Sequence, residues 1–123
     1  MTSTLDAYER YVAATGAVLN KTMDYLYITP AQYDKLQSLY FGVGNRTFEL
    51  TPNAQIWPRQ FNSLINGDPD LIYLIIHEKP ESLLAGTDFI AGLTFLERIY
   101  AVFDTSNHRV GFANTPYTNA ETN

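Results

Sequence analysis

The sequence predicts a mainly β fold with two or three short helices. Apolar segments are short and rich in branched or aromatic residues, as in Tyr25 to Ile28 and Leu71 to Ile76, and turn-forming residues separate them. The helix signals are brief and lie between these segments. With 123 residues, 46% of them hydrophobic, the chain can bury a core of its own. We expect one domain over residues 1–116 and a flexible tail over residues 117–123.

The first third of the chain combines two helix signals with one strand signal. Apolar residues at helical spacing from Asp6 to Ala14 predict an amphipathic helix that ends before Gly16. Tyr25 to Ile28 then reads as a strand. In Thr29-Pro30-Ala31-Gln32, Thr can act as N-cap, Pro suits the first helical position and Gln completes a capping box. The buried face of this second helix is expected to comprise Tyr33, Leu36, Leu39 and Tyr40.

Two hairpins are expected further along. Tyr40 to Val43 and Thr47 to Leu50 flank the Gly-containing connection Gly44-Asn45-Arg46. Ile99 to Phe103 and Arg109 to Phe112 flank a polar turn in the same way. The remaining expectations are an irregular Thr51 to Pro58 anchored by Trp57, a turn at Asn66-Gly67-Asp68-Pro69, a central strand at Leu71 to Ile76, a polar loop around Lys79-Pro80-Glu81, a strand at Phe89-Ile90 and a helical turn at Thr94 to Arg98.

Composition excludes several classes of function. The net charge is −5 and the eight Lys and Arg are scattered, so no basic surface for nucleic acid is expected. No apolar run approaches the roughly 20 residues that cross a bilayer. The absence of cysteine removes thiolate nucleophiles, thiolate metal sites and disulfides. The polar first residues lack the basic and apolar segments of a secretory signal.

Isolated motifs give no catalytic or cofactor site. His77 and His108 are the only histidines, they lie outside any G-x-S-x-G or H-E-x-x-H pattern, and we expect both at the surface. Asp68-Pro69-Asp70 lacks the later Gly and closing Glu of a calcium loop. Gly42-Val43-Gly44 lacks the third glycine of a phosphate loop. We expect no metal and no cofactor.

Three segments resemble the C-terminal lobe of pepsin-like aspartic proteases, especially the polyporopepsin type of basidiomycete fungi. They are ITPAQYDKLQSLYF, TFELTPNAQIWPR and DFIAGLTFLERIYAVFDTSNHRVGFANT. The last is the most specific, because the family typically ends with Ile-x-Gly-x-x-Phe-Leu-x-x-x-Tyr-x-Val-Phe-Asp, a turn and Val-Gly-Phe-Ala. The matching residues are Ile90, Gly92, Phe95, Leu96, Tyr100, Val102, Phe103, Asp104, Val110, Gly111, Phe112 and Ala113.

The resemblance implies a chemistry that this chain lacks the residues to perform alone. The family needs two carboxylates that share a proton, one from each lobe, each on an Asp-Thr/Ser-Gly loop. Neither triplet is present. Met1-Thr2-Ser3-Thr4-Leu5 resembles a remnant of the second loop, with Met1 in place of Asp. No catalytic residue is therefore assigned.

Asp104-Thr105-Ser106 differs from the catalytic triplet by one residue, yet we expect it to form a turn. Asp, Thr, Ser and Asn between two apolar strands are residues whose short side chains bond nearby backbone in tight turns. Ser106 also stands where a catalytic loop needs Gly. In the family, the matching Asp begins the turn of the final hairpin and is not catalytic.

Three functions remain open. The first is a non-catalytic binding or interaction protein, for which the resemblance implies secretion. The second is a piece of an aspartic endopeptidase that needs the other lobe. The third, least favoured, is a homodimeric protease using Asp6, whose Leu-Asp-Ala context lacks supporting Gly and hydroxyl groups.

The expected partner is a protein or a second copy of the chain. Tyr25, Tyr27 and Tyr40 are candidates for the surface that the other lobe would cover, and exposed apolar patches favour self-association. No nucleic acid and no membrane span are expected. Two sequons, at Asn20 and Asn45, are candidate glycosylation sites in a secreted chain.

Overall fold

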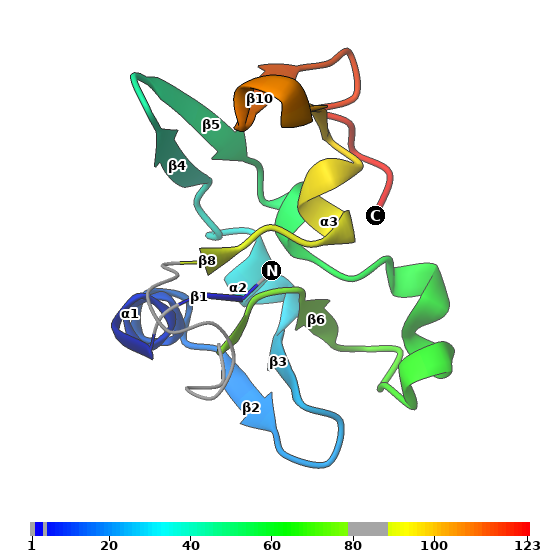
Figure 1. The fold of residues 1–123 in the computed structure, drawn as a ribbon. Helices are drawn as coiled ribbons and strands as arrows, with labels where there is room; N and C mark the ends of the chain where they lie inside the picture. The colour runs from blue at the N-terminus through cyan, green and yellow to red at the C-terminus, as the bar shows by residue number, and fades with distance from the viewer. Residues whose placement is uncertain (1, 4, 79–88) are drawn as a thin grey trace.

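The fold is mainly β, as the sequence predicts. The computed structural model describes residues 2–3, 5–78 and 89–123, and within them the strands form four small sheets (Figure 1). The expected polar loop around Lys79-Pro80-Glu81 lies outside the described residues. The sheets are β7-β1-β8 (His77–Glu78, Thr2–Ser3, Phe89–Ile90), β2-β3-β6 (Val18–Asn20, Tyr25–Ile28, Ile72–Leu74), β4-β5 (Leu39–Val43, Arg46–Leu50) and β10-β9 (Arg109–Asn114, Ile99–Asp104).

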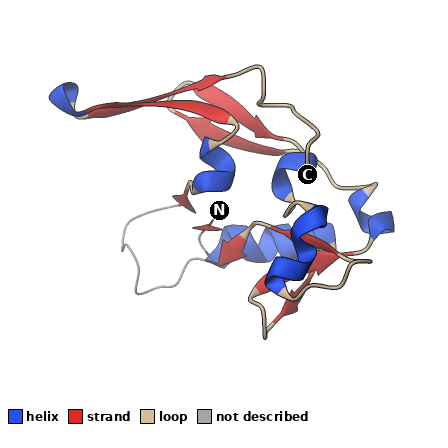
Figure 2. Cartoon of the chain, turned by 90° about the vertical axis from the view of Figure 1, so that its right-hand side faces the viewer, coloured by secondary structure: helices blue, strands red, loops and turns tan. Residues whose placement is uncertain are grey.

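Short helices connect these sheets. The helices are α1 (Leu5–Thr15), α2 (Pro30–Tyr33) and α3 (Leu93–Leu96), with 3-10 helices η1 (Asn53–Gln55), η2 (Arg59–Ile65) and η3 (Thr105–Asn107). Among the described residues, no helix is long and apolar enough to cross a membrane. Figure 2 shows the last hairpin projecting from the rest of the molecule, with η3 at its tip.

The helix α1 ends where the sequence indicates. Gly16 has a φ of +67°, and its N–H donates to the Val12 carbonyl at 2.9 Å. Glycine suits this left-handed position after a helix because it has no Cβ. A Cβ would also lie 2.9 Å from Nε2 of Gln32, which itself donates to the Gly16 carbonyl at 2.9 Å. The turn after α1 is thereby tied to α2.

The capping box of α2 is confirmed, but the expected length of the helix is wrong. Thr29 accepts from the Gln32 N–H at 3.3 Å, and Gln32 accepts from the Thr29 N–H at 2.8 Å. The helix ends at Tyr33. Leu39 and Tyr40, expected on its buried face, belong to β4, where Leu39 pairs with Leu50 and Tyr40 with Glu49. The tertiary contact with β5 overrides the helical spacing of these residues.

The core lies where β3 and β6 pair. Its members with at most 1% exposure include Leu26, Ile28, Leu50, Ile56, Ile72 and Leu74. Burying each such side chain stabilises the fold by roughly 1.5–3 kcal/mol. The expected central strand is corrected in one respect, because β6 is last in the order β2-β3-β6. Its outer side is covered by residues 55–57, with the Trp57 N–H donating to the Tyr73 carbonyl at 2.8 Å.

The C-terminal segment, expected from its polar sequence to be a flexible tail over residues 117–123, makes hydrogen bonds to the rest of the chain. The Asn53 carboxamide oxygen accepts from the N–H groups of Thr122 and Asn123 at 3.0 and 3.2 Å. It also accepts from the buried Arg98 guanidinium at 3.1 Å, and Arg98 donates in turn to the Ala120 carbonyl. The tail thus supplies one oxygen acceptor, the Ala120 carbonyl, to a guanidinium in a residue that is only 4% exposed.

Candidate functional site

The first residues, which resemble a remnant of a catalytic loop, are incorporated into a sheet. Met1 and Thr4 lie outside the described residues. Thr2 pairs with His77 on one side and Ile90 on the other, so β1 is the middle strand of its sheet. Asp6 follows in the first turn of α1, where its exposed carboxylate pairs with Arg10 at 3.2 Å. A helical, ion-paired Asp6 gives the homodimeric protease no support.

Asp104 forms the expected turn. It ends β9, and its carboxylate accepts from the Asn107 side chain at 2.8 Å, from Arg109 Nε at 2.8 Å and from the Asn107 N–H at 3.3 Å. These hydrogen bonds, that of the Asn107 side chain first and then that of Arg109, hold the pKa of Asp104 below its ordinary value. The carboxylate caps η3, and its hydrogen bonds all join residues of the same hairpin turn.

His77 is not the surface side chain that the sequence led us to expect. It is half-buried, with its ring edge-on to Tyr25 at a centroid distance of 5.0 Å. Burial lowers the pKa of His77. Tyr25 contacts Trp57 in the same manner at 6.1 Å, which confirms Trp57 as the anchor of its loop. The rings of His77, Tyr25 and Trp57 thus contact one another in a row, and His77 has a packing role.

The other motifs form turns. His108 is exposed, as expected, and occupies the left-handed position that ends η3. The Asp68 carboxylate accepts from the Asp70 N–H at 2.8 Å within its turn. Gly42 and Gly44 belong to the β4–β5 hairpin. In the part of the chain that the structure describes, no three His, Asp or Glu side chains gather to hold a metal.

Both sequon asparagines stand at hairpin turns. Asn20 ends β2, and its side-chain oxygen accepts from the N–H groups of Thr22 and Met23 at 3.0 and 3.2 Å. Asn45 is exposed at the turn between β4 and β5. Glycosylation of either residue stays a prediction.

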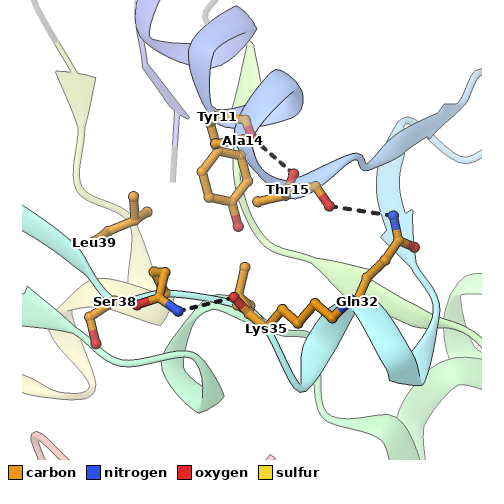
Figure 3. A pocket seen from close by; sticks show the side chains of 9 residues that line it. Tyr11, Ala14, Thr15, Gln32, Lys35, Ser38 and Leu39 are labelled. Atoms are coloured by element: carbon orange, nitrogen blue, oxygen red, sulfur yellow. Dashed lines mark hydrogen bonds between the residues drawn. The ribbon is translucent and has the colours of Figure 1, made fainter.

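A hollow of about 320 Å³ lies between α1 and the segment from α2 to β4. Figure 3 shows Tyr11, Thr15, Gln32 and Lys35 around it. Polar side chains that line the hollow form hydrogen bonds within the protein. Tyr11 Oη donates to the buried Gln55 side chain at 3.0 Å, and the Thr15 hydroxyl donates to the Tyr11 carbonyl at 2.8 Å. These bonds organise the wall of the hollow.

Several exposed apolar side chains lie together on the last hairpin. We define the hairpin surface as Tyr100, Val102, Phe103 and Val110, which are 62%, 47%, 67% and 51% exposed. Within the described residues, β9 and β10 pair only with each other. At the base of the hairpin, Ile99 is buried and Phe112 packs on Phe48 and Phe95, whereas the outer half extends beyond this support (Figure 2).

Both faces of the hairpin surface are apolar. Tyr100 and Val102 share one face with Ala113 and Gly111, to which they pair across the strands. Phe103 and Val110 pair on the other face. A two-stranded hairpin is marginally stable alone, and a strand with two apolar faces normally has cover on both. In the sequence, the consecutive apolar residues from Ile99 to Phe103 indicate that both faces of this strand are apolar, beyond the hairpin that they predict.

The expected tyrosine surface is largely wrong. Tyr25 and Tyr27 are half-buried, and they contact Trp57 and Tyr73 respectively. Of the three, Tyr40 alone is well exposed, at 66%. The larger apolar surface belongs to β9 and β10 instead.

Comparisons with known proteins give one consistent result. The family model for eukaryotic aspartyl protease matches residues 1–115. Polyporopepsin of Irpex lacteus is 51% identical over 118 residues, covering 96% of this chain and 35% of that protein. Dog renin is 28% identical over 98 residues, covering 80% of this chain and 23% of that protein. The crystal structure of the aspartic proteinase from Irpex lacteus superposes with a TM-score of 0.92 and 49% identity, over 99% of this chain and 36% of that one. The chain thus spans about a third of the length of polyporopepsin.

Proposed function

Since this chain belongs to the eukaryotic aspartyl protease family, we propose that it acts as a non-catalytic half-domain that binds a protein through the hairpin surface. The observation that supports this most is the outer half of the β9–β10 hairpin, apolar on both faces and paired on neither outer edge within the described residues. Exposed apolar patches and open strand edges are typical of interaction sites. The proposal includes secretion, by analogy with the family.

The chemistry of the chain favours binding over hydrolysis. Peptide hydrolysis in this family requires two carboxylates close enough to share a proton. The sequence contains no Asp-Thr/Ser-Gly triplet, the carboxylate of Asp104 caps a turn, and that of Asp6 pairs with Arg10 on an exposed helix. We therefore expect no hydrolysis by this chain alone.

A cleavage assay tests the absence of catalysis. The purified, folded chain is incubated with an unfolded protein substrate from about pH 2.5 to about pH 7, with and without pepstatin, at several protein concentrations. We expect no pepstatin-sensitive cleavage at any pH. Cleavage whose specific activity rises with protein concentration would overturn the proposal and indicate a dyad built between two copies.

A second candidate function is the complementing part of an endopeptidase. It is favoured by the 51% identity to a polyporopepsin of which this chain covers 35%. The test is to mix the chain with a separately produced remainder of that relative, containing both its catalytic triplets, and to assay pepstatin-sensitive cleavage. Activity that neither part shows alone would favour this function, whereas persistent inactivity of a mixture shown to associate would exclude it.

A further inference from the structure

We propose that η1 and the residue after it form a site that recognises an asparagine residue of a peptide segment, and that the chain's own tail occupies this site. We define the asparagine site as Asn53, Ile56 and Arg98. The residue that it binds is Asn123. This inference concerns a different part of the molecule from the hairpin surface and goes beyond the proposed function.

Asn53 and Asn123 bind each other reciprocally. The Asn53 side chain binds the backbone of Asn123, because its oxygen accepts from the Asn123 N–H at 3.2 Å and its amide donates to the Asn123 carbonyl at 2.9 Å. The Asn123 side chain donates in turn to the carbonyls of Asn53 and Ile56, both at 3.1 Å. The contact therefore depends on the Asn123 carboxamide as well as on its backbone.

The buried Arg98 determines which way the Asn53 carboxamide faces. A guanidinium only donates hydrogen bonds, so Arg98 Nη2, which lies 3.1 Å from Asn53 Oδ1, requires the oxygen on that side. The amide nitrogen of Asn53 then faces the Asn123 carbonyl. Asn53 and Arg98 are both buried, which restricts their rotation. The site is thus arranged for one N–H and one carbonyl of a bound segment.

The geometry of the site selects asparagine over aspartate. A carboxylate has no hydrogen to donate, so aspartate at position 123 places negative oxygens against the carbonyl oxygens of Asn53 and Ile56. A site built to form hydrogen bonds with a group rejects an analogue that lacks it, because its own polar atoms are left unpaired. Alanine loses the two bonds without adding the repulsion. We therefore expect the site to prefer Asn to Ala, and Ala to Asp.

Polar contacts account for much of the binding of the tail. Tyr117 is 71% exposed, and Asn119, Glu121 and Thr122 are exposed as well. A hollow of about 250 Å³ is lined by residues of the tail and by residues 97–98. Individual hydrogen bonds contribute modestly to stability, so detachment of the tail has a small free-energy cost. The site is then open to another segment that carries asparagine.

Amide hydrogen exchange of the full chain tests the selectivity of the site for its own tail. Asn123→Asp should accelerate exchange of the Thr122 amide, which donates to Asn53, at least about tenfold, and Asn123→Ala should accelerate it less. Asn119→Asp is the matched control, since it adds the same charge to the same tail at an exposed position. It should leave the exchange unchanged, and equal acceleration by both Asp variants would contradict the selectivity.

A separate peptide tests whether the site binds a segment that is not part of the same chain. A labelled synthetic peptide of residues 115–123 is titrated into the Asn123→Asp chain, whose own tail competes weakly. We expect the peptide to bind, and the unmodified chain to bind it more weakly because its tail is present at a millimolar effective concentration. A peptide with Asn123→Asp should bind at least about ten times more weakly than one with Asn119→Asp, which has the same charge.

Two results would overturn the asparagine site. One is the absence of peptide binding up to about 1 mM in an Asn123→Asp chain that circular dichroism and the fluorescence of Trp57 show to be folded. The other is equal affinity for the two Asp-bearing peptides. If Asn123→Asp does not fold, Asn123→Ala takes its place in the same titration, with the same two results counting against the site. Neither result bears on the hairpin surface or on catalysis, so the proposed function is tested separately.

Discussion

Asp104 shows how neighbouring residues determine the use of a carboxylate. Its hydrogen bonds to Asn107 and Arg109 stabilise the ionised form and depress its pKa. A depressed pKa means that the folded state gains stability from this group above the pKa of the unfolded chain, about 3.9. That stability is lost as the pH falls through the lower pKa of the folded state.

We expect Asp104→Ala to lower the urea midpoint of unfolding at about pH 5 to about pH 7. The difference from the unmodified chain should shrink as the pH falls below about 4 and vanish once the folded carboxyl is protonated. Urea unfolding of both proteins at several pH values measures this. A difference that stays constant down to low pH would show that the carboxylate has no stabilising charge interaction.

Tyr11, unlike Asp104, has a buried hydrogen-bond partner. Its hydroxyl donates to Gln55 Oε1 at 3.0 Å, Gln55 is 0% exposed, and burial raises the pKa of Tyr11. Tyr11→Phe leaves that acceptor without its donor, so we expect a loss of about 1–3 kcal/mol in the free energy of unfolding. Urea unfolding measures the loss. Tyr40→Phe, at an exposed position, is the control, and equal losses in both variants would contradict the role of the buried bond.

At the scale of elements, local signals in the sequence were sufficient where a few adjacent residues define the structure. The capping box of Thr29 and Gln32, the end of α1 before Gly16 and the turn of Asp104 all depend on neighbours within a few positions. They could therefore be predicted without knowledge of the fold.

Elements that depend on distant residues could not be predicted in this way. Leu39 and Tyr40 have helical spacing, but they join β4 because β5 provides a partner ladder. The strand β2 was missed, since Val18 and Leu19 are both exposed and show no alternation. The sequence of the tail does not reveal its hydrogen bonds to Asn53, because these join residues 69 and 70 positions apart.

The tail network yields a prediction at this scale. Asn53→Ala removes an oxygen acceptor from the buried Arg98 and two backbone donors of the tail lose their partner. We expect a loss of about 1.5–3 kcal/mol in the free energy of unfolding, because the bond involves a charged group. Amide hydrogen exchange should become faster over residues 118–123. Asn119→Ala, at an exposed position, is the control, and unchanged exchange in Asn53→Ala would contradict the anchoring.

For the whole molecule, the exposed hairpin and the missing triplets belong to one interpretation. The core around β3 and β6 is well buried, whereas β9 and β10 extend beyond it with apolar side chains on both faces. In the function that we propose, a protein partner covers the hairpin surface. Its location could be recognised only once the structure showed that β9 and β10 lack further strands among the described residues.

Amide hydrogen exchange of β9 and β10 at low and high protein concentration tests this claim most directly. At low concentration we expect the amides of the outer hairpin to exchange much faster than those of β3, whose Leu26 and Ile28 are 1% exposed. Raising the protein concentration, or adding a protein that binds the hairpin surface, should slow amide exchange along β9 and leave the exchange rates of β3 unchanged. Hairpin amides as protected as those of β3 in the dilute monomer would contradict the account, because the hairpin would then be complete without a partner.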